Sequence, residues 1–463
     1  MKSDYDQTDA RSILGFALTL TGKTLSDFIT EDERSRIIEN KSNKGDLGNL
    51  VEKYYFKINP GNSSAPDFPD AGVELKTTAV LPYKKRKQLK SGDRTLLNTA
   101  PDQYRAKERL KLTTINYTKI VNENWIGNSL FKKCETILLL LTLYEAGVLM
   151  IDRRFIAQPL LWNLPDKDMD FIRNDWMTIV SKIQEGRAHE LSGSDTYYLE
   201  ACTSGSGRLK NQPHSDIKAK ERSFAFKSSY VTASFLSGAK FIESLEPIIQ
   251  NGESPRDFES LVIKRVHSFK GLTVNDIAEM LKTDLSKSKQ YLALLSYAML
   301  SIETRRAEEF VKAGIEIKTI NLRPNGTPGE DVSFPALSYM DIVNEEWEDS
   351  VFKQKIDTKV LFMIFQKDSD GMVRFLKSIF WSMPLEDIME AKRVWEETKK
   401  RVASGNADKL PLKDFSDVSH VRNHGTDSKP KNRIPTPSNG MLPVKGFWLN
   451  AGYVKNQIKE DIL

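Results

Sequence analysis

The stretch that decides the fold runs Asp67-Phe68-Pro69-Asp70-Ala71-Gly72-Val73-Glu74-Leu75-Lys76-Thr77. Its second part favours an extended strand, in which side chains two positions apart point to the same face. Glu74 and Lys76 should therefore project together, while the residue between them points into a core. Pro69 and Gly72 permit a turn that would bring the Asp67 carboxylate back beside Glu74. We predict that two carboxylates and a lysine converge on one face of a sheet.

The same pattern returns in the second half as Glu309-Phe310-Val311-Lys312-Ala313-Gly314-Ile315-Glu316-Ile317-Lys318-Thr319. Further landmarks recur at one constant displacement: Trp162, Pro165, Trp176 and Gly186 return as Trp381, Pro384, Trp395 and Gly405. A shared displacement argues for duplication. A chain of 463 residues also suits two domains of about 200 residues each. We expect domains at residues 1–240 and 263–463, joined by a polar, turn-prone linker at 241–262.

Hydrophobic periodicity gives a coarse secondary structure. Helices are predicted at Asp46–Phe56, Asp166–Glu185 and Pro384–Ser404, and strands at Val73–Ala79, Thr136–Tyr144 and Tyr197–Ala201. The most apolar run, Thr136–Leu143, is far shorter than the roughly 20 residues of a membrane helix and indicates a buried central strand. This order of helices and short strands predicts α/β domains, each with a central mixed sheet flanked by helices.

The composition indicates a folded protein without a membrane segment. Apolar residues make up 39% and charged residues 28%, as in ordinary soluble globular chains. The net charge of +5 is a mild excess that is compatible with an anionic partner. The first residues lack the basic and apolar stretches of a signal peptide, so we expect a cytoplasmic protein. Its two cysteines, Cys134 and Cys202, are then reduced and structural.

Asp67, Glu74 and Lys76 predict a magnesium-dependent hydrolase. Hard carboxylate oxygens bind Mg²⁺, which takes waters and phosphate oxygens as its other ligands. Such a site polarises a phosphodiester and lowers the pKa of a bound water, which the lysine could orient. The pattern alone is weak, because roughly 0.1 to 0.3 chance matches are expected per chain of this composition. The alternative is a surface ion pair contributing about 0–1 kcal/mol.

The surrounding residues supply a context for this pattern. The run Lys44-Gly45-Asp46-Leu47-Gly48-Asn49-Leu50-Val51-Glu52, with Asp67-Phe68-Pro69 and Gly72-Val73-Glu74-Leu75-Lys76, resembles the MutH/Sau3AI family of GATC-specific endonucleases. The resemblance continues through Ala106–Leu110, Ile115–Tyr117, Gly186–Leu191, Asn211–Pro213, Ser215–Lys220 and Lys227–Ser228. It implies tandem restriction-endonuclease-like domains of the PD-(D/E)XK, MutH-like type.

The resemblance also implies a chemistry and its residues. Asp67, Glu74 and Lys76 would be catalytic, with Mg²⁺ on the two acids, and Glu52 would be a supporting acid. The alternative for Glu52 is an exposed helical acid paired with Lys53. The implied activity is that of a type II restriction endonuclease of a restriction-modification system, cutting double-stranded DNA at 5′-GATC-3′. A DNA methyltransferase would be its functional but not its physical partner, and the protein would act as a monomer or as a dimer formed on DNA.

Basic and amide residues are candidates for DNA contact. Lys132 and Lys133 precede the apolar strand, where the family has an important lysine, but the pattern does not decide between them. Arginine can read guanine and Asn or Gln adenine, while lysines bind phosphate. The predicted DNA-binding residues of the segment 203–227 are Arg208, Asn211, Gln212, Lys218, Lys220, Arg222 and Lys227. The basic run Lys84–Lys87 is a further candidate, and a solvated polar surface is the alternative in each case.

The second copy of the pattern is degenerate. Its candidate site is made of Glu309, Glu316 and Lys318. Ala278 falls where the supporting acid would be, and Asn450 falls where the first half has a lysine. The resemblance implies an inactive domain that binds a second DNA site as an allosteric effector. The alternatives are a MutH-like mismatch-repair nickase, against which the second domain argues, and a nuclease-dead DNA-binding regulator, against which the intact first pattern argues.

Overall fold

The computed structural model describes residues 4–39, 47–61, 65–83, 101–145, 147–156, 158–204, 207–250, 252–285, 290–424, 433–438 and 440–459. The basic run Lys84–Lys87 lies outside these ranges. The chain divides into two compact units, Met1–Leu191 with Asp195–Ser244, and Leu245–Leu463 with Ser192–Ser194. The division after Ser244 falls inside the segment expected as a linker, and the domain limits given above stay a prediction.

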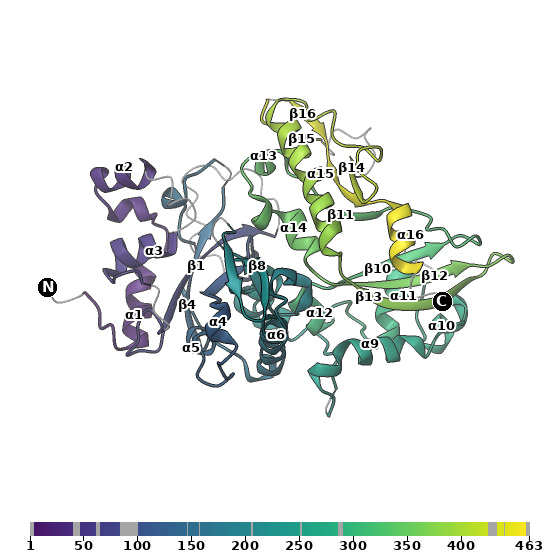
Figure 1. Ribbon diagram of the computed structural model, residues 1–463, viewed down its shortest axis with the longest axis horizontal. Coiled ribbons are helices and arrows are strands. Elements are labelled where there is room, and N and C mark those ends of the chain that lie inside the picture. Colours follow the sequence, from purple (N-terminus) through teal and green to yellow (C-terminus); the bar gives the residue numbers. More distant parts are fainter. Residues whose placement is uncertain are drawn as a thin grey trace. The chain divides into compact units, whose positions relative to one another are not determined.

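The described part of the first unit holds a four-stranded mixed sheet of order β2-β1-β4-β5, a three-stranded sheet of order β3-β9-β6, and the β7-β8 hairpin. Figure 1 labels β1, β4 and β8 of this unit. The strands are β1 (Glu74–Pro82), β2 (Tyr104–Ala106), β3 (Leu110–Thr114), β4 (Thr136–Leu143), β5 (Leu160–Asn163), β6 (Leu199–Thr203), β7 (Leu209–Gln212), β8 (Ser215–Lys220) and β9 (Arg222–Phe226). The helices are α1 (Ala10–Ala17), α2 (Glu31–Glu39), α3 (Leu47–Val51), α4 (Tyr117–Ile120), α5 (Ser129–Cys134), α6 (Asp166–Gln184), α7 (Ser228–Val231) and α8 (Ala239–Ile242).

The parallel pair β1–β4 lies at the centre of the four-stranded sheet. Its register runs from Glu74 opposite Ile137 to Val80 opposite Leu143. The predicted apolar strand is confirmed as β4, and its residues from Ile137 to Leu143 are buried. Helix α3 packs on β1, and its core residues Leu47, Leu50 and Val51 cover this sheet. A strand that is buried on both faces reads as a continuous apolar run, as observed.

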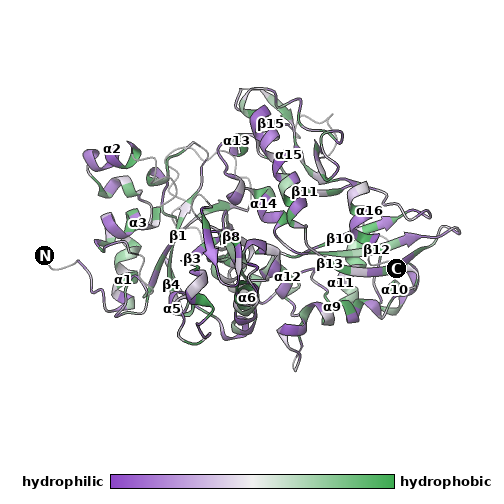
Figure 2. Ribbon diagram, in the orientation of Figure 1, coloured by the Kyte–Doolittle hydropathy of each residue, from purple (hydrophilic) through white to green (hydrophobic). Residues whose placement is uncertain are grey.

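The described part of the second unit repeats this plan, with sheets of order β10-β12-β13 and β11-β17-β14 and the ribbon β15-β16. The strands are β10 (Glu316–Leu322), β11 (Val332–Ala336), β12 (Val360–Lys367), β13 (Val373–Trp381), β14 (Ser419–Asn423), β15 (Arg433–Pro435), β16 (Met441–Pro443) and β17 (Lys445–Leu449). The helices are α9 (Phe258–His267), α10 (Val274–Met280), α11 (Tyr291–Met299), α12 (Glu308–Ala313), α13 (Tyr339–Ile342), α14 (Val351–Ile356), α15 (Leu385–Ala403) and α16 (Ala451–Lys459). Hydrophobic residues gather along β12, while α15 carries both hydrophobic and hydrophilic residues (Figure 2).

Equivalent residues of the two units occupy equivalent places. Strand β10 runs parallel to β12 from Glu316 opposite Val360, as β1 does with β4. The rings of Trp125 and Trp176 lie 5.8 Å apart at 60°. Those of Trp347 and Trp395 lie 5.6 Å apart at 57°. The prediction of two homologous α/β domains is confirmed.

Local interactions explain where the elements begin and end. Helix α6 stops before Gly186, whose φ of 73° is the left-handed conformation that closes a helix. The predicted strand Tyr197–Ala201 begins later, at Leu199, because the buried Asp175 carboxylate accepts the backbone N–H groups of Tyr197, Tyr198 and Leu199. The predicted helix 46–56 is described from Leu47 and becomes a π-helical turn over Glu52–Phe56.

The structure also bears on the predictions about membrane segments and cysteines. No helix in the described ranges is both long and apolar enough to cross a membrane. Cys134 and Cys202 are free thiols, and both are buried.

Candidate active site

A tight turn places Asp67 beside the start of β1. Phe68 and Val73 pair as an isolated antiparallel bridge, with N···O distances of 2.9 and 3.1 Å. Gly72 closes this turn with a φ of 66°, which favours glycine. Oδ2 of Asp67 accepts the backbone N–H of Leu75 at 2.9 Å. The turn predicted from Pro69 and Gly72 therefore forms.

Glu74 is the buried centre of the site. Its side chain is fully buried, and Lys76 Nζ lies 2.5 Å from Oε1. Lys133 Nζ lies 3.1 Å from Oε1 and 3.3 Å from Oε2. Burial raises the pKa of Glu74, and the nearby Asp67 charge raises it further, so that the lysines offset these effects only in part. Burial is thus the largest influence on this carboxylate.

The structure separates the two neighbouring lysines of α5. Lys133 is buried against Glu74, whereas Lys132 is exposed. Successive helical residues point about 100° apart, so only one of them can face the site. The geometry favours Lys133 as the lysine that acts with Glu74.

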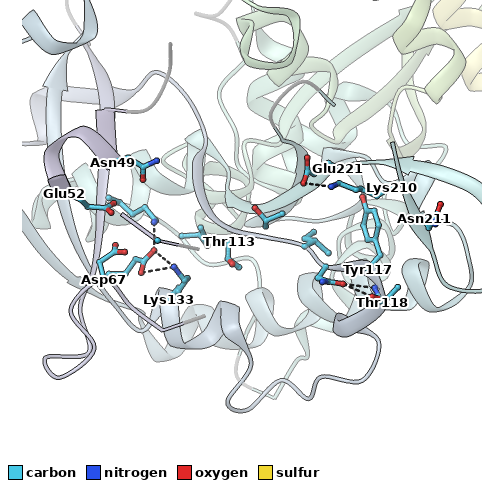
Figure 3. Close-up of a pocket in the computed structure, with 17 residues that line it drawn as sticks. Asn49, Glu52, Asp67, Thr113, Tyr117, Thr118, Lys133, Lys210, Asn211 and Glu221 are labelled. Carbon is cyan, nitrogen blue, oxygen red and sulfur yellow. Dashed lines mark hydrogen bonds and ion pairs between the residues drawn. The ribbon is translucent and has the colours of Figure 1, made fainter. Parts of the chain in front are cut away.

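A cavity of about 580 Å³ opens on these residues. Glu52, Asp67 and Lys133 lie at one end, Lys210 and Asn211 at the other, and Thr113 between them (Figure 3). The full lining is Asn49, Glu52, Gly61, Asp67, Glu74, Lys76, Leu112, Thr113, Thr114, Ile115, Asn116, Tyr117, Thr118, Lys133, Lys210, Asn211 and Glu221. Glu52 is buried where α3 meets the π-helical turn. The cavity thus connects the acidic cluster with the β7-β8 hairpin.

The hairpin is fastened to the rest of the unit. Tyr117 on α4 donates its hydroxyl hydrogen to the Lys220 carbonyl. Gln212 is buried: its Oε1 accepts the Ala188 N–H at 2.6 Å, and its Nε2 donates to the Ile217 carbonyl at 2.5 Å. These contacts give the predicted adenine reader Gln212 a role in holding the hairpin, and its DNA contact stays a prediction.

The remaining predicted DNA contacts divide by exposure. The exposed ones are Arg208, Asn211, Lys218 and Lys220. Arg222 donates from Nη1 to the Ala201 carbonyl at 2.6 Å. Lys227 is buried and donates to the Thr196 carbonyl at 2.6 Å. The side chains of Arg222 and Lys227 are thus held by backbone carbonyls near β6 and β9. The four exposed residues are better placed to reach a ligand.

Two carboxylates are available for a metal ion. The described residues contain no group of three or more His, Cys, Asp or Glu side chains that could hold one. Because Asp67 uses Oδ2 for the Leu75 N–H, its Oδ1 can serve as a ligand beside Glu74. Mg²⁺ is commonly held by one or two carboxylates together with water and substrate phosphate. The residues present fit an ion of that kind.

The equivalent site of the second unit has a different charge balance. Glu316 contacts Lys318 at 2.8 Å and Lys355 at 2.5 Å. Burial would raise the pKa of Glu316, but the two lysines outweigh it and lower the pKa to about 2. Lys355 on α14 corresponds in place to Lys133 on α5. The sequence reasoning missed Lys355, because four residues separate it from β12, whereas two separate Lys133 from β4.

Glu309 does a different job from Asp67. It lies on α12 and is buried, and its two oxygens accept the N–H groups of Ile248 and Ile249 at 2.8 and 2.9 Å. Its carboxylate holds backbone in place. Ala278 lies on α10, whereas the helix that packs on β10 is α11. The helix that takes the place of α3 in the second unit is therefore α11, and Ala278 does not lie in it.

Comparison with known proteins agrees with this geometry. A family model of the DNA mismatch repair enzyme MutH matches residues 56–175 and 299–390, one segment in each half. The type II restriction enzyme Sau3AI of Staphylococcus aureus is 31% identical, over 91% of this chain and 94% of that protein. The MutH proteins of Shewanella woodyi and Pasteurella multocida are 27% and 23% identical over 44% of this chain, covering 91% and 96% of their own lengths. This chain therefore belongs to the MutH/Sau3AI endonuclease family and resembles its type II restriction enzymes along nearly its whole length.

Proposed function

We propose that this DNA endonuclease is a type II restriction enzyme that hydrolyses both strands of DNA at 5′-GATC-3′ with Mg²⁺. The observation that carries the proposal is the convergence of Asp67, Glu74 and Lys76 at one end of a cavity that reaches the β7-β8 hairpin. The full-length similarity to a restriction enzyme supports this function over a mismatch-repair nickase, whose relatives match only 44% of the chain.

Each residue of the cluster has a task in this reaction. A bound Mg²⁺ would polarise the scissile phosphate and lower the pKa of a water molecule. Asp67 and Glu74 would hold it, with the Leu75 N–H fixing the orientation of the Asp67 carboxylate. Lys76, which Glu74 positions, would orient the attacking water. Lys133 would offset negative charge that develops on the phosphate.

Sequence reading is assigned to the hairpin. Asn211 on β7 and Arg208 directly before β7 are exposed, and their side chains can bond adenine and guanine edges in the major groove. The exposed Lys218 and Lys220 would bind phosphate. The GATC assignment comes from the family resemblance, and the chemistry of these side chains is compatible with it. A methyltransferase that modifies the same sequence would be the functional partner.

The test is digestion of unmethylated plasmid DNA with Mg²⁺, followed by mapping of the ends. We expect double-strand breaks at GATC, none with EDTA, and none with Asp67→Ala or Lys76→Ala. Breaks elsewhere would remove the GATC assignment, single-strand nicks would favour the nickase, and equal activity in the variants would remove the site.

We also propose that the second unit binds a further DNA site as an effector. Two lysines beside one carboxylate leave a net positive charge at Glu316, which suits a phosphate group. Plasmids with two sites should then be cut faster than plasmids with one, and Lys355→Glu should remove this advantage while one-site cleavage persists. Equal rates on both plasmids would exclude the effector role. Sedimentation with and without DNA would show whether the protein stays a monomer or dimerises on DNA.

A further inference from the structure

Asn116 presents an unused hydrogen-bond donor to the cavity. It precedes α4, and Oδ1 accepts the backbone N–H groups of Thr118 and Lys119, both at 3.2 Å, and the Thr118 hydroxyl at 2.9 Å. Backbone N–H groups only donate, so the atom that they contact must be the oxygen. The amide nitrogen Nδ2 is therefore turned away from the helix. Asn116 is exposed and lines the cavity, and no described residue accepts a hydrogen bond from Nδ2.

The second unit builds the same corner without an amide. Ser338 caps α13 by accepting the Asp341 N–H at 3.4 Å. Tyr339 then donates its hydroxyl hydrogen to the Pro443 carbonyl at 2.8 Å, as Tyr117 does to the Lys220 carbonyl. A hydroxyl therefore suffices for the cap, and the helix start does not require the amide of Asn116.

Asn128 shows what an asparagine with a purely internal role looks like. It caps α5 through Oδ1, which accepts the Phe131 N–H at 2.7 Å. Its Nδ2 donates to the Trp125 carbonyl at 2.8 Å, and the residue is 4% exposed. Both ends of that side chain are satisfied inside the protein. At Asn116 only the oxygen end is.

We propose that Asn116 Nδ2 donates a hydrogen bond to bound DNA between the cleavage site and the reading hairpin. The inference rests on the proposed function. Asn116 belongs to the segment Leu112–Thr118, which lines the same cavity as Glu74 and Lys210. DNA that reaches both places passes this segment, and it carries acceptors as phosphate oxygens and base-edge atoms. Thr114 on the same segment is also exposed and lines the cavity, and its hydroxyl oxygen accepts a hydrogen bond from Ser223 at 3.5 Å.

Two substitutions separate the donor from the cap. Asn116→Ser keeps a good cap, as Ser338 does in the second unit, and removes the amide. Asn116→Asp also keeps the cap but puts an acceptor with negative charge in place of the donor. Ser338→Asp makes the matched change at the equivalent corner of the second unit.

The experiment measures binding of a GATC duplex with Ca²⁺ in place of Mg²⁺, single-turnover cleavage with Mg²⁺, and the melting temperature of the full chain. We expect unchanged melting temperatures, binding weakened about 3- to 10-fold by Asn116→Ser, and a larger, salt-sensitive loss with Asn116→Asp. Ser338→Asp should bind within about 2-fold of wild type. Uniform weakening across duplex sequences would identify a phosphate oxygen as the acceptor, and relaxed discrimination at one base pair would identify a base edge.

Three outcomes would overturn this inference. Both Asn116 variants could bind and cleave as the wild type does. Both could lose binding only in step with a lower melting temperature, which would make the residue a helix cap alone. A wild-type protein that neither binds nor cuts the duplex would remove the proposed function itself, and that failure is visible before any variant is made.

Discussion

Glu74 and Glu316 begin equivalent strands in the two units, yet the charged groups around them carry different net charges. The Glu74 side chain is fully buried beside Asp67, and its pKa is raised. The Glu316 side chain is 36% exposed between two lysines, and its pKa is lowered to about 2. The same strand register therefore supports two different sites.

The difference has two sources: Glu309 does not take the place of Asp67, and the Glu316 side chain is more exposed than that of Glu74. In the first unit Asp67 adds negative charge beside Glu74, so two carboxylates face Lys76 and Lys133 and no positive charge is left in excess. In the second unit Glu309 is occupied by backbone N–H groups, and Lys318 and Lys355 already exceed the charge of Glu316. The first arrangement suits a divalent metal ion and the second suits an anion.

The largest expected effect comes from exchanging each central glutamate for its amide. Glu74→Gln should lower the cleavage rate on the order of 10³-fold, because an amide is a poor metal ligand and no longer positions Lys76. Glu316→Gln should change single-site cleavage by less than about 3-fold. Single-turnover rates on a one-site duplex make the comparison, with circular dichroism as the check on folding. Equal losses in the two variants would show that both sites take part in the chemistry.

The neighbouring lysines of α5 offer a sharper contrast. Lys133→Met should slow cleavage on the order of 10²-fold, because it removes the buried ammonium that contacts both oxygens of Glu74. Lys132→Met changes an exposed residue and should stay within about 2-fold. The same single-turnover measurement applies to both. A greater loss with Lys132→Met would reverse the assignment made from the geometry.

Asp67 and Glu309 open the two copies of the pattern and should respond in opposite ways. Glu309→Gln should destabilise the protein by about 1–3 kcal/mol, because one of the two backbone N–H groups that the buried carboxylate accepts loses its acceptor. Its effect on one-site cleavage should be small. Asp67→Asn should do the reverse, with a large loss of cleavage and little change in urea unfolding. A destabilised Asp67→Asn beside an unchanged Glu309→Gln would contradict this division of tasks.

The sequence predicted the parts of the site that depend on local geometry. Strand periodicity placed Glu74 and Lys76 on one face, and the Pro69–Gly72 spacing predicted the turn. Other features depend on long-range packing. The burial of Gln212 is set by Ala188 on a distant segment, and Lys227 is fixed by the Thr196 carbonyl. No spacing rule reveals such partners.

The signals for two other residues were present but needed the structure to acquire meaning. An asparagine before the short helix at Tyr117 indicates a cap, but only the cavity shows that its amide faces a ligand space. Glu309 matched Asp67 in order along the chain, yet it lies in a helix rather than in a turn. Two residues can therefore match in sequence order while their side chains point in different directions, because the local backbone differs.

The smallest expected effect is the response of the second unit to acid. Glu316 has a pKa of about 2 in the folded chain, below its ordinary value of 4.5, so its ion pairs stabilise the fold above pH 4.5. This stability is lost as the pH falls from 4.5 towards about 2, because the carboxylate takes up a proton and releases Lys355 and Lys318. Glu316→Gln and Lys355→Met should therefore both flatten the fall in melting temperature across this window. The shift should be modest, since the side chain is 36% exposed and solvent screens its pairs. If the melting temperature of both variants fell as steeply between pH 4.5 and about 2 as that of the wild type, the stabilising charge would lie elsewhere. Glu316 would then not differ from Glu74 in the way proposed.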